Sequence, residues 1–149
     1  MIENAHLTVD IVVLAPDADT QRWHVLLIER GDEPYKGRRA LPGGDVDPHE
    51  LPAAAALREL VEETGLDIAQ DEPLIEIGTF SEPGRDPRGR VVSIAHLAVL
   101  PGMKTVTAGD DATAAEWVPV PAALDSQLAF DHHLILRAAL AAADYPPFL

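Results

Sequence analysis

The chain has 149 residues, 47% of them hydrophobic, which is enough for one soluble domain with a sizeable core. Its 11 basic and 25 acidic residues give a formal net charge of −14, which argues against nonspecific binding to nucleic acid or to an anionic membrane surface. The absence of cysteine excludes disulfides, thiolate zinc sites and cysteine nucleophiles.

The amino-terminal stretch MIENAHLTVDIVVLA has no basic region before a long apolar run, so it does not resemble a signal peptide. No span of the sequence reaches transmembrane length. We therefore expect a cytoplasmic protein in which residues 1–149 form a single domain without a linker.

Two aliphatic runs near the amino terminus predict a β-hairpin. Residues 11–15 and 25–29 are β-branched or aliphatic, and the polar, turn-rich segment PDADTQRW separates them. A short segment, residues 39–42, then leads into Gly43 and Gly44. Because these glycines have no side chain, a carbonyl can turn there toward a metal or a phosphate.

The segment after these glycines predicts a helix. Pro52 suits a first helical turn, where its missing N–H is not needed, and Gly65 suits the left-handed position that ends a helix. The helix would therefore have about 13 residues, a typical length. We expect an apolar stripe to dock it on a sheet, formed by Ala53, Ala54, Leu57, Leu60 and Val61.

Three carboxylates crowd the second half of this helix. Glu59, Glu62 and Glu63 fall within five residues, and side chains three or four positions apart share a helix face. Their repulsion requires compensation, and Arg58, which can reach Glu62, supplies only one positive charge. Hard divalent ions such as Mg²⁺ choose carboxylate, water and phosphate oxygens as ligands. The cluster therefore predicts a divalent-cation site on the face opposite the apolar stripe.

The rest of the chain contains further predicted strands and one more helix. Residues 74–81 and 90–100 predict two strands, joined by the loop EPGRDPRG. Residues 116–120 predict a short last strand, and residues 126–143 predict a carboxy-terminal helix followed by the tail DYPPFL. Several strands interrupted by one helix and closed by another predict an α/β fold with a mixed sheet between helices.

The glycine, arginine and glutamate spacing resembles a known motif. Residues 44–66, GDVDPHELPAAAALRELVEETGL, fill every fixed position of the Nudix box, G-x5-E-x7-R-E-U-x-E-E-x-G-U, where U is aliphatic. These positions are Gly44, Glu50, Arg58, Glu59, Leu60, Glu62, Glu63, Gly65 and Leu66. The chain departs from the usual family pattern at Asp47, His49 and Leu51, which bears on helix capping more than on activity. The chain thus resembles the Nudix, or MutT-like, hydrolases.

This resemblance implies a fold, a reaction and a set of site residues. The fold would be an α/β/α sandwich, and the reaction would be Mg²⁺-dependent hydrolysis of a diphosphate linkage, with Mn²⁺ as an alternative ion. The implied metal ligands are the Gly43 carbonyl and the carboxylates of Glu59, Glu62 and Glu63. Glu50 and Arg58 would complete the catalytic set by supporting this geometry. The general base varies within the family.

Arginines outside the box are candidates for substrate binding. Arg85, Arg88 and Arg90 concentrate positive charge in an acidic chain and could engage a phosphate or a ribose. Alternatively, the loop pairs internally, with Asp86 as the partner of Arg85 or Arg88. The run RDPRGRVVS resembles Nudix enzymes that act as ADP-ribose pyrophosphatases. It also resembles a branch of Nudix-like regulators with a winged-helix extension, which we do not expect here because only DYPPFL follows the last predicted helix.

Two further segments contribute candidate site residues. The lead into the box, PYKGRRALPGG, places Tyr35, Arg38 and Arg39 near the site entrance, where Tyr35 either stacks on a base or is structural. Asp110 or Asp111 is a candidate base or extra metal ligand, because several Nudix enzymes use a loop acid from this region; a solvated turn is the alternative. The histidines show no metal-binding spacing, and we expect them on helix surfaces or in packing.

The substrate and the assembly remain open at this level. The loop motif favours ADP-ribose or an ADP-sugar, the alternatives being an 8-oxo-dGTP or other nucleoside triphosphate hydrolase and a catalytically inactive nucleotide-binding module. A homodimer is expected from resemblance to ADP-ribose-type Nudix proteins. The run from residue 11 to residue 14 lacks clear alternation, so either a partner or the monomer itself must cover both of its sides.

Overall fold

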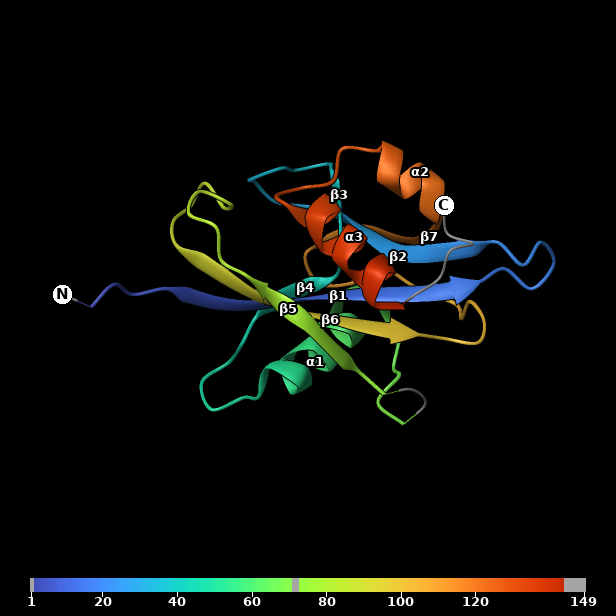
Figure 1. Cartoon of the computed structure of the whole chain (residues 1–149), viewed down its shortest axis with the longest axis horizontal. Coiled ribbons are helices and arrows are strands. Elements are labelled where there is room, and N and C mark those ends of the chain that lie inside the picture. Colours follow the sequence, from blue (N-terminus) through green and yellow to red (C-terminus); the bar gives the residue numbers. More distant parts are fainter. Residues whose placement is uncertain (1, 71–72, 144–149) are drawn as a thin grey trace.

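A seven-stranded mixed sheet forms the centre of the computed structural model, which describes residues 2–70 and 73–143 (Figure 1). In chain order the elements are β1 (His6–Pro16), β2 (Trp23–Arg30), β3 (Arg39–Ala40), β4 (Gly43–Asp45), α1 (Pro52–Thr64), β5 (Ile75–Phe80), β6 (Val91–Val99), β7 (Ala112–Pro119), α2 (Val120–Asp125) and α3 (His132–Ala143). Within the described residues, no helix has the length and apolar character needed to cross a membrane.

Strand β1 is the strand around which the sheet is arranged. The main order is β3-β2-β1-β6-β5, with β4 also paired to β1 and β7 to β2. The β1–β6 pair is parallel, whereas the other pairs are antiparallel, so the predicted mixed sheet and the predicted hairpin of β1 and β2 are confirmed. Strand β1 pairs with β4 through Thr8 to Asp10 and with β2 through Leu14 to Pro16. The partner of β1 therefore changes midway along the strand.

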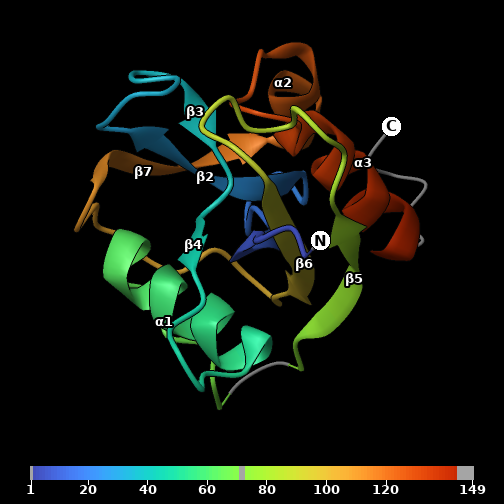
Figure 2. The same cartoon turned by 90° about the vertical axis from the view of Figure 1, so that its left-hand side faces the viewer.

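Helices cover both faces of the sheet, which confirms the predicted α/β/α sandwich (Figure 2). On one face, Val12 and Leu14 of β1 pack with residues of α2 and α3. On the other face, Ile11 and Val13 pack with residues of α1. All four β1 side chains are fully buried. The monomer itself thus covers both sides of the run whose lack of alternation left a partner as an alternative.

Helix α1 has the predicted length and ends as predicted. Gly65 follows it with φ 71°, and its N–H donates to the Val61 carbonyl. At the other end, Leu51 provides no side-chain hydrogen bond to the helix, as its apolar side chain requires. His49, where the family commonly has glycine, has φ 67°, which is the left-handed region that glycine favours.

The predicted docking stripe of α1 is largely wrong. Leu60 is fully buried and Leu57 is partly buried, but Ala53, Ala54 and Val61 are exposed. The helix instead buries a face composed of Ala55, Ala56, Glu59, Leu60, Glu63 and Thr64. Two of these residues are carboxylates that line a pocket, so the apolar and acidic stripes are adjacent rather than opposite.

The carboxy-terminal elements also differ from the prediction. Strand β7 begins at Ala112, four residues before the predicted start, and Val120 begins the unpredicted helix α2. Helix α3 begins at His132 instead of residue 126. Phe130 has φ 53°, which is incompatible with a continuous right-handed helix. The tail DYPPFL lies outside the described residues.

Candidate functional site

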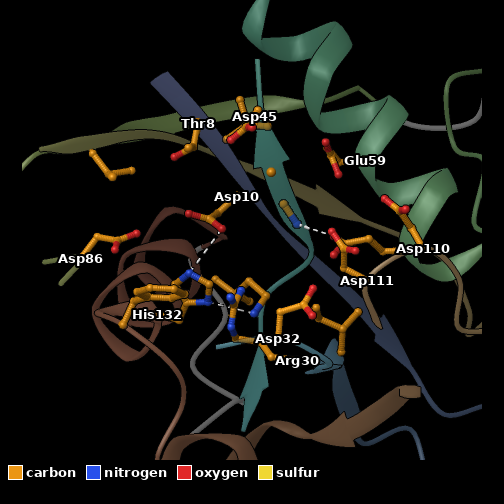
Figure 3. Close-up of a pocket in the computed structure, with 18 of the residues that line it drawn as sticks. Thr8, Asp10, Arg30, Asp32, Asp45, Glu59, Asp86, Asp110, Asp111 and His132 are labelled. Atoms are coloured by element: carbon orange, nitrogen blue, oxygen red, sulfur yellow. Dashed lines mark hydrogen bonds and ion pairs between the residues drawn. The ribbon is translucent and has the colours of Figure 1, made fainter. Parts of the chain in front are cut away.

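A pocket of about 270 Å³ lies where β1, β4 and α1 meet the loops before β6 and β7 (Figure 3). The carboxylates that line it are Asp10, Asp32, Glu33, Asp45, Glu59, Glu63, Asp86, Asp110 and Asp111. The arginines that line it are Arg30, Arg85 and Arg88. Carboxylates therefore outnumber arginines in the pocket lining. In so acidic a site, a phosphate ester would need a cation, and carboxylates are suitable ligands for one.

Three carboxylates converge at one side of this pocket. One oxygen from each of Glu59, Glu62 and Asp110 lies within 4.8 Å of the others. Backbone hydrogen bonds hold the Asp110 loop against the end of α1: Gly109 N–H donates to the Glu63 carbonyl (3.1 Å) and Thr107 N–H donates to the Thr64 carbonyl (2.9 Å). The sequence placed Glu59 and Glu62 together on one helix, and the fold adds Asp110 from a distant loop.

The carboxylates of Glu59 and Glu63 on α1 are buried, and the protein compensates their negative charge only in part. Burial raises the pKa of Glu59 to about 7, although Arg58 lies 3.1 Å away. Burial likewise raises the pKa of Glu63 to about 8, against one hydrogen bond from the Gly43 N–H at 2.8 Å. Oxygen ligands from three carboxylates, incompletely neutralised by the protein, fit a hard divalent cation.

Arg58 holds the carboxylates of Glu50, Glu59 and Glu62 in place by hydrogen bonds. Its guanidinium donates two hydrogen bonds of 2.9 Å to the carboxylate of Glu50 and longer ones to Glu59 and Glu62. It also donates to the backbone carbonyl of Asp45. The hydrogen bonds from Arg58 hold the pKa of Glu50 at about 2. Glu50 and Arg58 therefore form a hydrogen-bonded support beside the cluster.

The adjacent glycines Gly43 and Gly44 permit close approaches that a side chain would block. A Cβ at Gly44 would lie 2.5 Å from the carboxylate of Glu59. A Cβ at Gly43 would overlap the backbone carbonyl oxygen of Val9 and lie 2.6 Å from Oδ1 of Asp10. Gly44 thus makes room for a site carboxylate, and Gly43 makes room for the neighbouring strand.

The structure separates the predicted substrate arginines. Arg85 lines the pocket, but its side chain is only 4% exposed and donates two hydrogen bonds to Asp131, at 2.6 and 2.9 Å. Of the two alternatives for the partner of Asp86, the structure has Arg88, at 2.8 Å, and not Arg85. Arg90 lies outside the pocket lining, with its guanidinium 3.9 Å from Glu3.

Two other predicted substrate residues also lie outside the pocket lining. The ring of Tyr35 packs edge-on against Phe130, with the centroids 4.8 Å apart. Arg39 forms an ion pair of 2.7 Å with Glu116. The structural alternative for Tyr35 is thus the one observed. Both loop acids, Asp110 and Asp111, line the pocket, and repulsion from Asp110 raises the pKa of Asp111.

Sequence reasoning missed Asp10 and His132, which form a buried polar pair in the pocket. The Leu41 N–H donates to Nδ1 of His132 (3.0 Å), so the ring proton is on Nε2, which lies 3.3 Å from Oδ1 of Asp10. The Ser93 hydroxyl donates to the other Asp10 oxygen at 2.5 Å. The predicted surface role suits the exposed His133, and His132 is buried, as the packing alternative expects, but the prediction did not include its place in the pocket lining. An available signal was Asp10 itself, a lone carboxylate within an aliphatic strand.

Comparison with known proteins extends these observations. The family model described as NUDIX domain matches residues 4–139. The ADP-ribose pyrophosphatase of Methanocaldococcus jannaschii is 43% identical over 113 residues, which cover 76% of this chain and 63% of that protein. The ADPR responsive transcriptional repressor NtrR of Acinetobacter baylyi is 35% identical over 137 residues, which cover 91% of this chain and 53% of that protein.

A solved structure shows the same likeness in three dimensions. The NUDIX domain of Shewanella oneidensis NrtR, complexed with ADP ribose, aligns with a TM-score of 0.85 at 27% identity. The alignment covers 95% of this chain and 90% of that one. The chain nevertheless spans less than two thirds of the length of both curated relatives.

Proposed function

Because the chain belongs to the Nudix family, we propose that it hydrolyses the diphosphate linkage of a nucleoside diphosphate derivative, with ADP-ribose or a related ADP-sugar as substrate. The convergence of Glu59, Glu62 and Asp110 beside the pocket is the observation that carries this proposal. The similarity to an ADP-ribose pyrophosphatase and to a domain that binds ADP ribose supports the choice of substrate.

The proposed mechanism assigns each side chain a task. A divalent cation, Mg²⁺ or Mn²⁺, held by carboxylates of the cluster would neutralise phosphate charge and polarise phosphoryl oxygens. Arg58 keeps Glu50 and the cluster carboxylates oriented. Oε1 of Glu63 accepts the Gly43 N–H. Its other oxygen is then available either to bind metal or to take a proton from the attacking water.

Replacement of a carboxylate on α1 tests the catalytic assignment. Glu62→Gln and Glu63→Gln should each lower kcat for AMP release from ADP-ribose by about a hundredfold or more, because each removes a charge needed in the reaction. EDTA should abolish the wild-type activity. The melting temperature of each variant serves as the control for folding. Activity retained in both variants with Mg²⁺ would refute the assignment.

The similarity to the repressor supports a second candidate, a nucleotide-binding module without catalysis. Complete box glutamates count against it, since loss of activity would be expected to affect those positions first. Binding of ADP-ribose without turnover of any member of a panel containing ADP-ribose, NADH, Ap4A and 8-oxo-dGTP would establish this alternative. A kcat/KM that favours 8-oxo-dGTP by about tenfold, or about 1.4 kcal/mol, would instead indicate a triphosphate hydrolase.

We also propose that the protein acts as a single-domain homodimer in the cytoplasm. The buried run from Ile11 to Leu14 gives no support to the dimer, because the monomer covers it. The amino-terminal segment that extends from the body of the molecule in Figure 1 does support it, with Ile2 and Leu7 exposed. Light scattering at micromolar concentration should give about twice the 16.0 kDa monomer mass, and a value near 16.0 kDa would refute the dimer.

A further inference from the structure

We propose that Arg30 binds the diphosphate of the substrate on the side of the pocket away from the carboxylate cluster. This inference rests on the proposed function, because it concerns the same pocket. Arg30 lies at the end of β2, where the pairing with β7 shifts register between Glu29 and Arg30. Such a shift re-aims a side chain. In Figure 3, Arg30 and His132 lie on one side of the pocket, and Glu59 and Asp110 lie on the other.

Two contacts fix the orientation of the Arg30 guanidinium. Its Nε donates to the Pro34 carbonyl at 2.7 Å, and its Cζ lies 4.9 Å from the centroid of the Phe130 ring. Phe130 and Tyr35, whose rings pack together, both have a positive φ, of 53° and 62°. Non-glycine residues in this conformation are strained and persist where the surrounding structure requires them. Here the contact between the two rings and the contact of Phe130 with Arg30 stabilise the two strained residues.

Arg30 differs from the other pocket arginines in its lack of a carboxylate partner. Arg85 is bound by Asp131 and Arg88 by Asp86. Among residues 2–70 and 73–143, no carboxylate forms an ion pair with Arg30, and of its side-chain nitrogens only Nε makes a hydrogen bond. The two terminal nitrogens of its guanidinium are therefore the donors that the protein leaves for a ligand.

The position of Arg30 suits it to bind an anion. Burial lowers the pKa of Arg30 most and the charge of Arg88 lowers it further, whereas the charges of Glu63, Asp86 and Asp32 only partly offset this lowering. The Arg88 guanidinium lies 5.7 Å from the same Phe130 ring. A guanidinium fork that is partly buried, fixed in orientation and near a second cation is suited to bidentate contact with phosphate oxygens. A metal at the carboxylates and Arg30 opposite would then contact a diphosphate from both sides.

Ligand binding separates this role from a purely structural one. We compare ADP with adenosine by calorimetric titration in EDTA, on wild type, Arg30→Gln and Arg30→Lys. Arg30→Gln should weaken ADP binding by about tenfold or more and leave adenosine binding unchanged, and Arg30→Lys should recover part of the loss. The matched control is Arg22→Gln, which makes the same charge change in the exposed turn between β1 and β2.

Three results would overturn the proposal. The first is equal weakening of ADP and adenosine, which would show that Arg30 supports the base. The second is unchanged ADP binding in Arg30→Gln, and the third is wild-type protein that binds ADP no more tightly than adenosine. Because these titrations involve no turnover, a protein that binds ADP through Arg30 but does not cleave ADP-ribose would refute the proposed function alone.

Discussion

At the scale of single residues, the adjacent glycines Gly43 and Gly44 should respond differently to the same added methyl group. Gly44→Ala would push only the end of the flexible Glu59 side chain, whose carboxylate lies 2.5 Å from the new Cβ. We expect a melting temperature within about 2 °C of wild type, since little packing changes. Metal affinity and kcat should fall about tenfold or more, because a cluster carboxylate is displaced. Calorimetric titration with Mn²⁺ and steady-state kinetics measure both.

Gly43→Ala is the matched comparison. Its Cβ would overlap the backbone of Val9, which cannot move without disturbing the β1–β4 pairing. We expect a loss of about 1–3 kcal/mol in the free energy of unfolding, measured by urea denaturation. If Gly43→Ala were as stable as wild type while Gly44→Ala unfolded, the assigned roles of the two glycines would be reversed.

The site residues that the sequence could identify are those that share a short segment. Glu59, Glu62 and Arg58 meet because helical spacing brings them together, and their charges imply their chemistry. Asp10 and His132 are separated by 122 positions, and only the packing of α3 against β1 brings them together. Arg30 is one of 11 basic residues, and nothing local distinguishes it from Arg39 or Arg90. Its importance depends on which partners the other arginines find.

At the scale of elements, helix α1 provides a test of which face packs on the sheet. Leu60 is fully buried, whereas Val61 is 44% exposed although both belonged to the predicted stripe. Leu60→Ala should cost about 2–5 kcal/mol of unfolding free energy, because it leaves a cavity in the core. Val61→Ala should cost less than about 1 kcal/mol. Comparable losses in urea denaturation would mean that the helix is rotated from the face described.

The error in the stripe has a physical cause. Periodicity assigned the helix face from apolar residues alone, and it therefore placed Glu59 and Glu63 on the face opposite the sheet. The pocket allows both carboxylates to be buried, so the true sheet-facing side mixes alanine, leucine and glutamate. The strands were more predictable because their aliphatic runs are bounded by turn residues. The start of α3 was not, because the left-handed Phe130 depends on its contact with Tyr35 and not on a local helix-breaking residue.

At the scale of the whole molecule, metal binding should be coupled to pH and to stability. The pKa values of Glu59 and Glu63, about 7 and about 8, lie above the ordinary 4.5. Between about pH 4.5 and pH 8 the unfolded chain therefore releases protons that the folded, metal-free protein still holds. The stability that these neutral carboxylates provide is complete below pH 4.5 and is lost as the pH rises through 7 to 8.

Thermal unfolding in EDTA and in Mg²⁺ measures this coupling. The increase in melting temperature on adding Mg²⁺ should be larger at pH 8 than at pH 5.5, because the ion binds ionised carboxylates and displaces their protons. In EDTA, the melting temperature of the Glu63→Gln variant should decrease less than that of wild type as the pH rises from 5.5 to 8. This comparison separates the site from the general repulsion of a chain with net charge −14. Parallel pH profiles for the two proteins would exclude Glu63 as the source.

The parallel pairing of β1 with β6 has a consequence for the order in which the protein is made. His6 pairs with Val91 and Leu14 with Val99, so β1 leaves the ribosome long before its partner exists. Contacts so distant in sequence form slowly. Helix α1 is synthesised in the interval, before the sheet beneath it can be completed. His132, which closes the Asp10 side of the pocket, comes later still. A nascent chain halted after residue 66 and before residue 132 would carry the whole acidic motif of residues 44–66 and no finished pocket.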